Sequence, residues 1–568
     1  MCGICGFTGY RQDQKTVIER MMKAIEHRGP DSEGSFCREK ITLGFRRLSI
    51  IDLEDGQQPM ESADGNLHIV FNGEIYDYKE LRAELEASGI SFCTHSDTEV
   101  LVNTIQQYGE KALDKLRGMF GFAVWNEKEQ TLMLARDFFG IKPVYYAEID
   151  GHFVFASEIK SILVFPGYER KVNQKALEQY LSFQYSPLEE TFFKGIYKLM
   201  PGHMLLYKNG SYEIKTYFKP KLTPGQWDHK TNMAQLRSQL SEILKDSVKH
   251  HMLSDVEVGA FLSGGVDSGY LASSSGADQA FTVGFDEGDR YSEVNKAAKH
   301  VKVVLSGEGA DELFGGYNIY REPEALKKVA WIPFVLRRAV RKLAAKLPDV
   351  KGRDFLIRAG MKVEERFIGN AYIYCEKEKE QILKNKVTGP STQEYLSQFY
   401  EELESENRDS LQDMEKMQSV DLNYWLPGDI LQKADKMSMA HSLEVRVPFL
   451  DKEIFNFAAK LPKEAKIAAG TTKYIFRKAV SEFLPQETNE RKKLGFPIPI
   501  RVWLRQNDWY QMVTDLFTSK EAEEFFHTEK LLQLLNDHKD KKADNSRKIW
   551  TVLTFLIWYD RFFTTCSK

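Results

Sequence analysis

Residues 257–274 of the chain, EVGAFLSGGVDSGYLASS, decide the fold class of its second half. The short apolar run at 257–262 predicts a strand, which leads through a glycine turn into a helical pattern. Two further runs, at 280–285 and 302–305, also end in glycine-bearing turns. Strands that alternate with glycine turns and helices indicate a parallel α/β sheet, and beyond residue 317 the pattern is mostly helical.

The first half of the chain follows a different pattern. Short apolar or alternating blocks, rich in glycine and aromatic residues, predict strands of an α+β domain with a largely antiparallel sheet. We therefore expect one domain over 1–215, a polar, turn-rich linker over 216–232 and a second domain over 233–568. The strand-like blocks lie at 41–52, 67–76, 118–125, 131–136 and 152–156, and the helical stretches lie at 16–27, 78–88 and 98–108.

The composition is that of an ordinary globular protein. Hydrophobic residues make up 42% of the 568 residues and charged residues 28%, which is enough apolar material for more than one core. Lysine plus arginine number 78 and aspartate plus glutamate 82, so the net charge of −4 argues against a nucleic-acid or membrane partner. The cysteines are sparse, and we find no signal peptide and no stretch long enough to span a bilayer, so we expect a cytoplasmic location.

Cys2 follows the initiator methionine directly. Its small side chain permits removal of Met1, which would leave a first residue with both a thiol and a free α-amine. Such an amine titrates near ~8, close enough to neutrality to accept the proton of the thiol. A cysteine at position 2 can equally have no function, so the neighbouring motifs have to decide between the two.

Six sequence blocks in the first half occur in a fixed order. Together they resemble the glutaminase domain of class II glutamine amidotransferases, which are N-terminal nucleophile hydrolases with an αββα fold. The resemblance covers roughly residues 2–210. The blocks are CGICGFTG (2–9), HRGPDSEG (27–34), RRLSIID (46–52), FNGEIYDYKEL (71–81), HSDTEV (95–100) and RDFFGIKPVYY (136–146).

This resemblance implies a role for particular residues. Cys2 would be the nucleophile, and the side-chain amide of Asn72 and the backbone N–H of Gly73 would form the oxyanion hole. The simpler alternatives are a turn asparagine, a surface arginine and a helix-capping aspartate at 97. The glutamine-binding residues would be Arg47 for the α-carboxylate, Glu74 and Asp97 for the α-ammonium, and Asn72 and Gly73.

The second half contains two glycine-rich motifs, SGGVDS at 263–268 and LSGEGADELFGGY at 305–317. Backbone N–H groups in a glycine turn at the start of a helix can bind an anion, and the spacing is not that of a Walker A loop. The motifs resemble the pyrophosphate loop of N-type ATP pyrophosphatases in its asparagine synthetase form. A glycine turn that closes a strand–helix unit is the alternative.

The resemblance implies that this region binds ATP and Mg²⁺. Asp267 and Asp311 would hold the metal, because Mg²⁺ prefers carboxylate and phosphate oxygens. Glu308 would be catalytic at the acyl-adenylate, and Lys473 would neutralise the leaving pyrophosphate unless it is simply a solvated helix lysine. The residues expected at ATP or pyrophosphate are Ser263, Gly264, Gly265, Asp267, Ser268, Val283, Gly284, Ser306, Gly307 and Lys473.

Taken together, the two halves resemble the glutamine-hydrolysing asparagine synthetases over nearly the whole chain. The resemblance implies ATP-dependent synthesis of asparagine from aspartate, with ammonia from glutamine, a β-aspartyl-AMP intermediate and an apolar tunnel past Met119. It also implies small-molecule substrates and a homodimer. The alternatives are amidation of another carboxylic acid such as a cell-wall precursor, glutaminase activity alone, or a glutamine-binding regulator without turnover.

One junction departs from this family. The helical stretch 292–300 runs directly into the strand at 301–305 without a glycine, asparagine or proline to stop the helix. We therefore expect residues to be absent between His300 and Val301. The family has a further strand–helix segment of about 50 residues there, within the crossover that parallel strands require.

Overall fold

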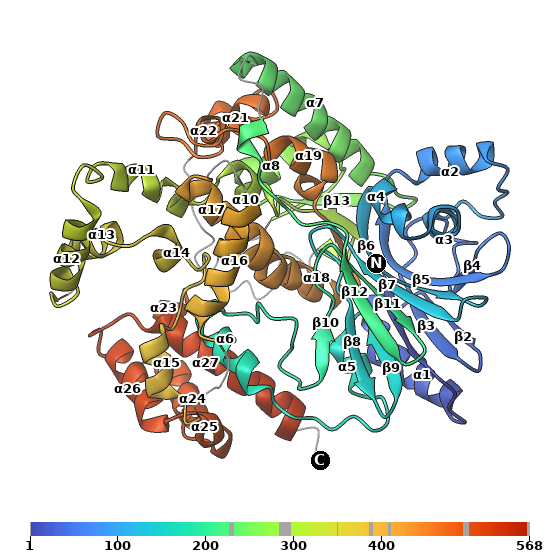
Figure 1. The fold of residues 1–568 in the computed structure, drawn as a ribbon, viewed down its shortest axis with the longest axis horizontal. Coiled ribbons are helices and arrows are strands. Elements are labelled where there is room, and N and C mark those ends of the chain that lie inside the picture. The colour runs from blue at the N-terminus through green and yellow to red at the C-terminus, as the bar shows by residue number, and fades with distance from the viewer. Residues whose placement is uncertain are drawn as a thin grey trace. The chain divides into compact units, whose positions relative to one another are not determined.

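The computed structural model describes most of the chain, in two compact units. The first unit comprises Met1–Glu169, Gly195–Pro323 and Leu411–Arg491, and the second comprises Arg170–Lys194, Glu324–Ser410 and Lys492–Lys568. Each unit is built from segments far apart in the sequence, and Figure 1 shows the order of the elements. The described residues are 2–226, 232–282, 297–348, 350–385, 390–406, 411–491 and 499–564.

The N-terminal part of the first unit contains two six-stranded antiparallel sheets. The first has the order β10-β8-β9-β1-β3-β2 and the second the order β12-β11-β7-β6-β5-β4. The strands of the first are β1 (Gly3–Thr8), β2 (Ser32–Cys37), β3 (Ile41–Arg47), β8 (Tyr145–Ile149), β9 (His152–Ala156) and β10 (Ile196–Lys198). Those of the second are β4 (Met60–Glu61), β5 (Leu67–Ile75), β6 (Gly118–Asn126), β7 (Thr131–Arg136), β11 (His203–Lys208) and β12 (Ser211–Thr216).

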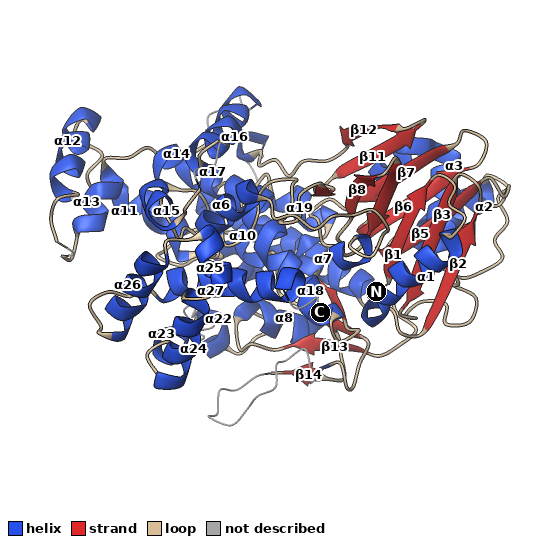
Figure 2. Cartoon of the chain, turned by 90° about the horizontal axis from the view of Figure 1, so that it is seen from below, coloured by secondary structure: helices blue, strands red, loops and turns tan. Residues whose placement is uncertain are grey.

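The two sheets pack face to face with helices outside them. Phe45 of the first sheet and Val70 of the second belong to one buried cluster, so apolar side chains of both sheets fill the space between them. On the outer face of the first sheet, a Cβ at Gly44 would lie only 2.7 Å from the side chain of Ile18, so glycine permits the close approach of α1. This is the expected αββα arrangement (Figure 2). The helices are α1 (Gln14–Ala24), η1 (Glu26–Arg28), α2 (Tyr78–Ala87), α3 (Asp97–Tyr108), η2 (Gly109–Lys111), α4 (Ala112–Lys115) and α5 (Ile159–Ile162).

The rest of the first unit contains the predicted parallel sheet. Its order is β14-β13-β15-β16, and all three pairings are parallel. The three expected strands are confirmed, although each is shorter than its apolar run. The elements are η3 (Pro224–Gln226), α7 (Met233–His251), β13 (Val258–Phe261), α8 (Val266–Ser274), β14 (Ala280–Phe281), β15 (Val303–Leu305) and β16 (Glu444–Arg446).

The expected junction lies in the crossover between β14 and β15. The amides of His300 and Val301 both donate to the carbonyl of Ala297, and this turn leads into β15. Residues 283–296 lie outside the described residues. The crossover over 282–302 meets the dozen or so residues that two parallel strands require, and the absence of residues after His300 stays a prediction.

Short helices complete the first unit. Many of them pack on the parallel sheet in one apolar core that also includes residues of the second antiparallel sheet. The helices are α10 (Ala310–Phe314), η4 (Asn318–Arg321), α17 (Asp413–Val420), the π-helix η5 (Asp421–Ile430), α18 (Leu431–Met439), η6 (Pro448–Leu450), α19 (Lys452–Ala458), α20 (Lys463–Lys466), α21 (Tyr474–Ala479) and α22 (Gln486–Glu490), with α11 (Glu322–Lys327) at the border between the units.

The described part of the second unit is almost entirely helical. Its core gathers Leu181, Leu531 and Val552 from helices far apart in the sequence. Among the described residues, no helix has both the length and the apolar composition needed to cross a membrane. The helices are α6 (Gln174–Phe183), α12 (Phe334–Ala344), α13 (Arg353–Ala359), α14 (Val363–Arg366), α15 (Glu376–Ile382), α16 (Thr392–Glu406), α23 (Ile500–Trp503), α24 (Asn507–Phe517), α25 (Lys520–Phe525), α26 (Thr528–Lys539), α27 (Ser546–Tyr559) and the π-helix η7 (Asp560–Thr564).

Candidate active sites

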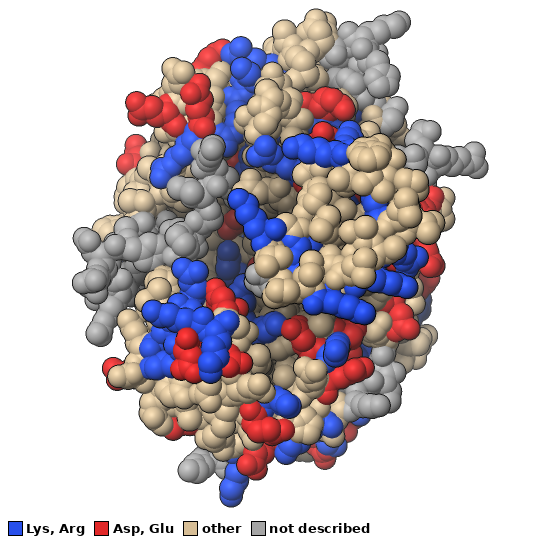
Figure 3. Space-filling model, turned by 90° about the vertical axis from the view of Figure 1, so that its left-hand side faces the viewer, with Lys and Arg blue, Asp and Glu red and all other residues tan. Residues whose placement is uncertain are grey.

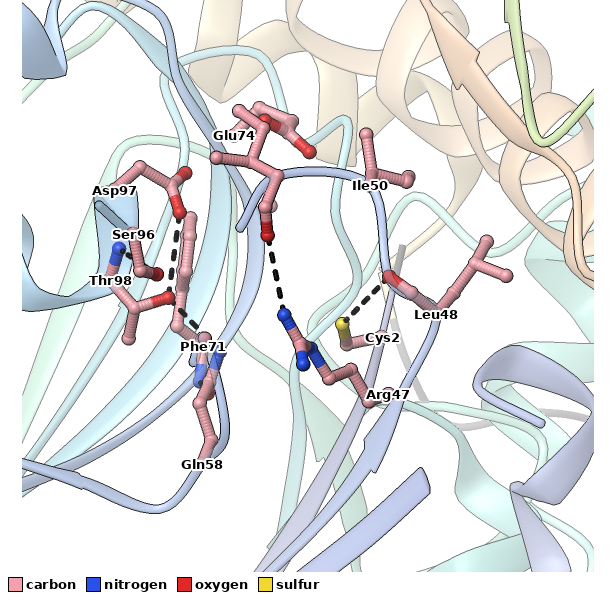
Figure 4. Close-up of a pocket in the computed structure, with 13 residues that line it drawn as sticks. Cys2, Arg47, Leu48, Ile50, Gln58, Phe71, Glu74, Ser96, Asp97 and Thr98 are labelled. Atoms are coloured by element: carbon pink, nitrogen blue, oxygen red, sulfur yellow. Dashed lines mark hydrogen bonds between the residues drawn. The ribbon is translucent and has the colours of Figure 1, made fainter. Parts of the chain in front are cut away.

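A pocket in the first unit gathers the residues predicted to bind glutamine. It encloses about 350 Å³, part of which opens to solvent. Figure 4 shows Cys2 and Arg47 on one side of the pocket and Asp97 on the other. We call it the Cys2 pocket, and it is lined by Cys2, Arg47, Leu48, Ile50, Ile51, Gly56, Gln58, Phe71, Gly73, Glu74, Ser96, Asp97 and Thr98.

Cys2 lies at the start of the central strand β1. The guanidinium of Arg28 donates to its carbonyl oxygen at 3.1 Å, and its Sγ lies 3.9 Å from the carbonyl oxygen of Leu48. Burial raises the pKa of the Cys2 thiol, so the resting thiol is protonated and needs a base before it can attack. Cys5 has the spacing of a redox pair with Cys2, but both are free thiols.

The side chain of Asn72 has one end satisfied and one end free. Its Oδ1 accepts the N–H of Cys2 at 3.0 Å. Its Nδ2 is buried and has no hydrogen-bond partner among the described residues. A buried donor without a partner is costly unless a ligand supplies the acceptor, which is what an oxyanion hole requires.

Gly73 follows Asn72 on β5, and its lack of a side chain has a steric reason. A Cβ at this position would lie 2.1 Å from the carbonyl oxygen of Met119 on the neighbouring strand β6. Only glycine permits this close approach of the two strands beside Cys2. The structure therefore brings Cys2, Asn72 and Gly73 together, while their catalytic roles stay predictions.

Arg47 ends β3, and backbone carbonyl groups orient it. Its guanidinium donates to Leu53 and Ile51, each at 3.3 Å, and to Asp52. No carboxylate of the described residues pairs with Arg47, and its side chain is buried in the pocket wall. A fixed guanidinium in this position can pair with a substrate carboxylate.

Asp97 is the first residue of α3, but it does not cap the helix. The cap is Ser96, whose hydroxyl oxygen accepts the N–H of Thr98 at 3.1 Å. The carboxylate of Asp97 instead accepts the N–H of Ile75 at 3.0 Å. Burial raises the pKa of Asp97 to about 6, so near neutral pH it is a buried anion at the pocket wall.

Glu74 lines the same pocket and pairs with a residue that the sequence analysis left without a role. Arg446 lies 3.3 Å from its carboxylate and also contacts Glu444 at 2.6 Å. Burial raises the pKa of Glu74 well above its usual value despite Arg446. Burial would raise the pKa of Glu444 too, but Arg446 and Lys142, among other positive charges, hold it at about 2.

Glu444 and Arg446, the first and last residues of β16, were not singled out by the sequence analysis. The only local signal is a pair of opposite charges two residues apart in a run that is otherwise apolar, EVRVPFL (444–450). Such side chains share one face of a strand and, when buried, require partners. The identity of those partners depends on tertiary contacts.

The predicted nucleotide loops lie side by side. SGGVDS follows β13 and the loop with Ser306 follows β15, and these strands are parallel neighbours, so both loops leave the same edge of the sheet. Gly264 has a φ of +72°, which favours glycine. The hydroxyl of Ser268 accepts the N–H of Ser263 at 3.1 Å, which fixes the turn at the start of α8.

The second loop contacts the first directly. A Cβ at Gly307 would lie 3.0 Å from the Cβ of Asp267. The N–H of Ser306 donates to the carbonyl of Arg446 at 2.8 Å. Glu308 lies half-buried in the turn that follows. Val283 and Gly284, the other predicted nucleotide contacts, lie outside the described residues.

Lys473 joins the two predicted metal ligands. Its Nζ lies 2.6 and 2.7 Å from the carboxylate oxygens of Asp267 and 2.8 Å from Asp311. Burial alone would lower its pKa, but the two carboxylates outweigh burial and raise it. The ammonium therefore already occupies a cation site between two carboxylates, and Lys473 is a buried residue rather than a solvated one.

Comparisons with known proteins agree with this division into two sites. The family described as glutamine amidotransferase domain matches residues 1–218, and the family described as asparagine synthase matches 239–299 and 294–560. Asparagine synthetase [glutamine-hydrolyzing] 1 of Bacillus subtilis is 42% identical over 98% of this chain and 96% of the relative. A putative asparagine synthetase [glutamine-hydrolyzing] of Mycobacterium tuberculosis is 35% identical over 99% of this chain and 97% of its own length.

Solved structures show a weaker likeness. Glutamine phosphoribosylpyrophosphate amidotransferase from B. subtilis is 17% identical, with a TM-score of 0.30, over 54% of this chain and 75% of that one.

Proposed function

The chain belongs to the asparagine synthase family and has a glutamine amidotransferase domain at its N-terminus, and we propose that it makes asparagine from aspartate with glutamine and ATP. The observation that carries the proposal is that one compact unit holds both sites. In the Cys2 pocket, the buried Nδ2 of Asn72 is a donor without a partner among the described residues. At the loops after β13 and β15, the buried Lys473 pairs with two carboxylates.

In the Cys2 pocket, the thiol attacks the side-chain amide of glutamine. With Met1 removed, the α-amine of Cys2 accepts the thiol proton and passes it to the leaving nitrogen. The Nδ2 of Asn72 and the N–H of Gly73 stabilise the oxyanion, an effect worth about 3–4 kcal/mol for one donor. A γ-glutamyl thioester forms, ammonia leaves, and water releases glutamate.

The same pocket recognises the amino-acid end of glutamine. Arg47 pairs with the α-carboxylate, because its guanidinium is already oriented by backbone carbonyls. The carboxylate of Asp97 accepts a hydrogen bond from the α-ammonium of glutamine. Glu74 lines the same pocket and contributes to the binding of this ammonium. These assignments leave Asn72 free for the reacting carbonyl.

At the second site, the β-carboxylate of aspartate attacks the α-phosphate of ATP and pyrophosphate leaves. The backbone of 263–268 and the loop at Ser306 and Gly307 bind the phosphates, and Lys473 offsets charge on pyrophosphate. Ammonia attacks the β-carbonyl carbon of β-aspartyl-AMP, the bond to the phosphate breaks, and asparagine and AMP are released. Glu308 lies beside the attacking ammonia and accepts its proton, and Val283 and Gly284 complete the nucleotide site. Ammonia reaches it through an apolar path past Met119, which is fully buried.

Mg²⁺ fits the residues present at this site. The carboxylates of Asp267 and Asp311 already share one positive charge, and carboxylate oxygens suit a hard cation. These two residues would hold the ion, which supplies charge neutralisation on the phosphates when it is bound.

The identity of the carboxylic acid that accepts the nitrogen is the part of the proposal that depends on the junction at 300–301. The two matches to the asparagine synthase family meet at 294–299, and the alignment with the B. subtilis relative runs over 621 positions although this chain has 568 residues. We propose that relatives carry a segment here that this chain lacks. Amidation of another carboxylic acid is the second candidate, and pyrophosphate release across a panel of acids distinguishes it. A homodimer in the cytoplasm completes the proposal.

Cys2→Ala tests the two-site scheme. We expect it to abolish glutamine-dependent asparagine formation and to leave formation from added ammonium salts unchanged, because only the first reaction needs the thiol. Asparagine and pyrophosphate are measured in parallel with each nitrogen source. Equal loss of both reactions would contradict the scheme. If the enzyme consumed no ATP with any carboxylic acid, its activity would be that of a glutaminase alone.

A further inference from the structure

A strongly basic segment lies near the start of Glu324–Ser410, the middle part of the second unit. Residues 325–348 contain seven lysines and arginines and no aspartate or glutamate, within a chain whose net charge is −4. The segment includes α12, which forms a helical hairpin with α13 (Figure 1). The charge balance of the whole chain therefore conceals a local positive patch.

The apolar side of α12 faces solvent. Val335 is 78% exposed, Leu336 56% and Leu343 68%, and Trp331 just before the helix is 81% exposed. Val340 and Leu347 continue the same side. The positions 336, 340, 343 and 347 have the spacing of one helix face, so these side chains form a stripe rather than isolated exposures.

The side of α12 that carries Arg337 and Arg341, its arginine side, is the one that contacts other parts of the second unit. Arg337 donates to the carbonyls of Ile332 and Ala359 at 3.0 and 3.1 Å, and Arg341 lies 3.8 Å from Glu365. A surface helix normally does the reverse and buries its apolar face. Within the described residues of the second unit, the apolar stripe has no such packing partner, which leaves it available to an external apolar surface.

Lys342 and Lys346 border the other side of the stripe, and both are exposed. Arg338 is 55% exposed on its side chain, but it lies on the arginine side and pairs with Glu365 at 3.4 Å. Figure 3 looks onto this side of the molecule and shows Lys and Arg side chains around uncharged surface. An apolar stripe flanked by lysine and arginine, with a tryptophan at one end, has the features of a helix that lies in a membrane interface.

We propose that α12 and its flanking residues dock this enzyme on an anionic lipid bilayer. The apolar stripe enters the boundary between headgroups and acyl chains, and the bordering cations contact acidic headgroups. A second copy of the chain fits poorly, because a two-fold contact through this stripe would bring two strongly positive segments together. The contact is peripheral, since an eleven-residue helix is too short to span a bilayer.

Vesicle sedimentation with the full chain tests this proposal. We expect the protein to sediment with equimolar phosphatidylglycerol and phosphatidylcholine vesicles at low salt, and not with phosphatidylcholine alone. Leu336→Gln with Leu343→Gln should reduce the bound fraction roughly tenfold, because two exposed apolar groups no longer enter the interface. Lys342→Ser with Lys346→Ser should reduce both the binding and its salt dependence.

The matched control is Val502→Gln with Ile557→Gln, two apolar residues of the same unit that are each 51% exposed. This variant should bind vesicles like the unchanged chain. Ammonium-dependent synthesis without vesicles, equal in all variants, establishes that each is folded. The proposal is overturned if the unchanged chain does not bind vesicles, or if the Leu336/Leu343 variant binds them equally well. It is also overturned if light scattering shows that the unchanged chain self-associates and that only the Leu336/Leu343 variant does not.

Discussion

Asp97 and Glu74 are two buried carboxyl groups in one pocket, and their surroundings give them different properties. Asp97 accepts a backbone N–H, which favours its charged form and limits the effect of burial. Glu74 depends on Arg446 for its charge, and burial raises its pKa much further. Near neutral pH, Asp97 would therefore be the better partner for the ammonium of a bound glutamine.

This difference predicts how glutamine binding depends on pH. Asp97 must be charged to bind an ammonium, and its pKa is raised to about 6, so KM for glutamine should rise as the pH falls through about 6. Asp97→Asn should raise KM about 10- to 100-fold and remove this pH dependence, because a charge-assisted hydrogen bond is worth about 1.5–3 kcal/mol. The measurement is steady-state glutaminase kinetics between pH 5 and 8.

The control for this series is the reaction with ammonium salts, which does not use the pocket. The pH dependence of its rate should be the same in the unchanged enzyme and in Asp97→Asn. A KM that stays flat down to pH 5 in the unchanged enzyme would show that Asp97 does not bind the ammonium.

Strand β16 links the two sites although it is only three residues long. The side chain of Arg446 contacts Glu74 in the Cys2 pocket, and its backbone carbonyl accepts the N–H of Ser306 in the nucleotide loop. The same guanidinium donates to the carbonyls of His251 and Leu253 at 2.8 and 2.6 Å. One buried residue thus holds a helix end, a pocket wall and a loop together.

Removal of the Arg446 charge should destabilise the first unit strongly. Arg446→Met leaves the Glu444 carboxylate buried without its cation and the Glu74 carboxyl group without its partner, which costs about 3–5 kcal/mol. Glu74→Gln and Glu444→Gln added to Arg446→Met should recover most of this loss, because no uncompensated charge is then buried. Urea unfolding followed by circular dichroism measures the difference.

An exposed ion pair gives the comparison. Arg11 pairs with Asp13 at 3.0 Å near the surface, and Arg11→Met should cost much less stability than Arg446→Met, because water screens this pair. Similar losses for Arg446→Met and Arg11→Met would mean that β16 does not hold the two sites together.

The elements that local sequence determines were predictable, and the contacts between distant segments were not. The turn at 263–268 follows from its glycines, and the strand before it from its apolar run. Asp97 looked like a possible cap because aspartate often caps helices, yet the hydroxyl of Ser96 reaches the free N–H instead. The pairing of Glu74 with Arg446 joins residues more than 300 positions apart, which no local pattern encodes.

The same limit applies to charge. A net charge of −4 suggested that no membrane would attract the protein, but the sum says nothing about where the charges lie. Residues 325–348 are positive as a group, and the outward apolar side of α12 becomes visible only once the packing of Arg337 is known. Local charge and tertiary packing together led to the proposed membrane contact.

The first unit holds both proposed sites around one continuous core. Phe71 and Met119 of the N-terminal sheets belong to the same apolar cluster as Val304 and Leu450 of the parallel-sheet part. Buried charges reinforce this contact: Arg28 donates to both carboxylate oxygens of Asp435, at 2.8 and 3.1 Å. A rigid apolar contact between the halves is what an internal path for ammonia requires, since ammonia must not be protonated on its way.

Transfer through the core predicts the origin of the nitrogen in asparagine. With glutamine labelled by ¹⁵N in its amide and an equal concentration of unlabelled ammonium, most asparagine should carry the label, because ammonia from Cys2 does not mix with solvent. Met119→Phe should lower the asparagine formed per glutamate while glutamine hydrolysis continues, because a rigid ring obstructs the path. Met204→Phe is the matched control, since Met204 is a buried methionine of the same sheet. Mass spectrometry of asparagine and glutamate measures these ratios. A ¹⁵N content of asparagine equal to that of the mixed nitrogen pool would contradict the internal path. An equal loss of asparagine per glutamate in Met119→Phe and Met204→Phe would contradict it as well.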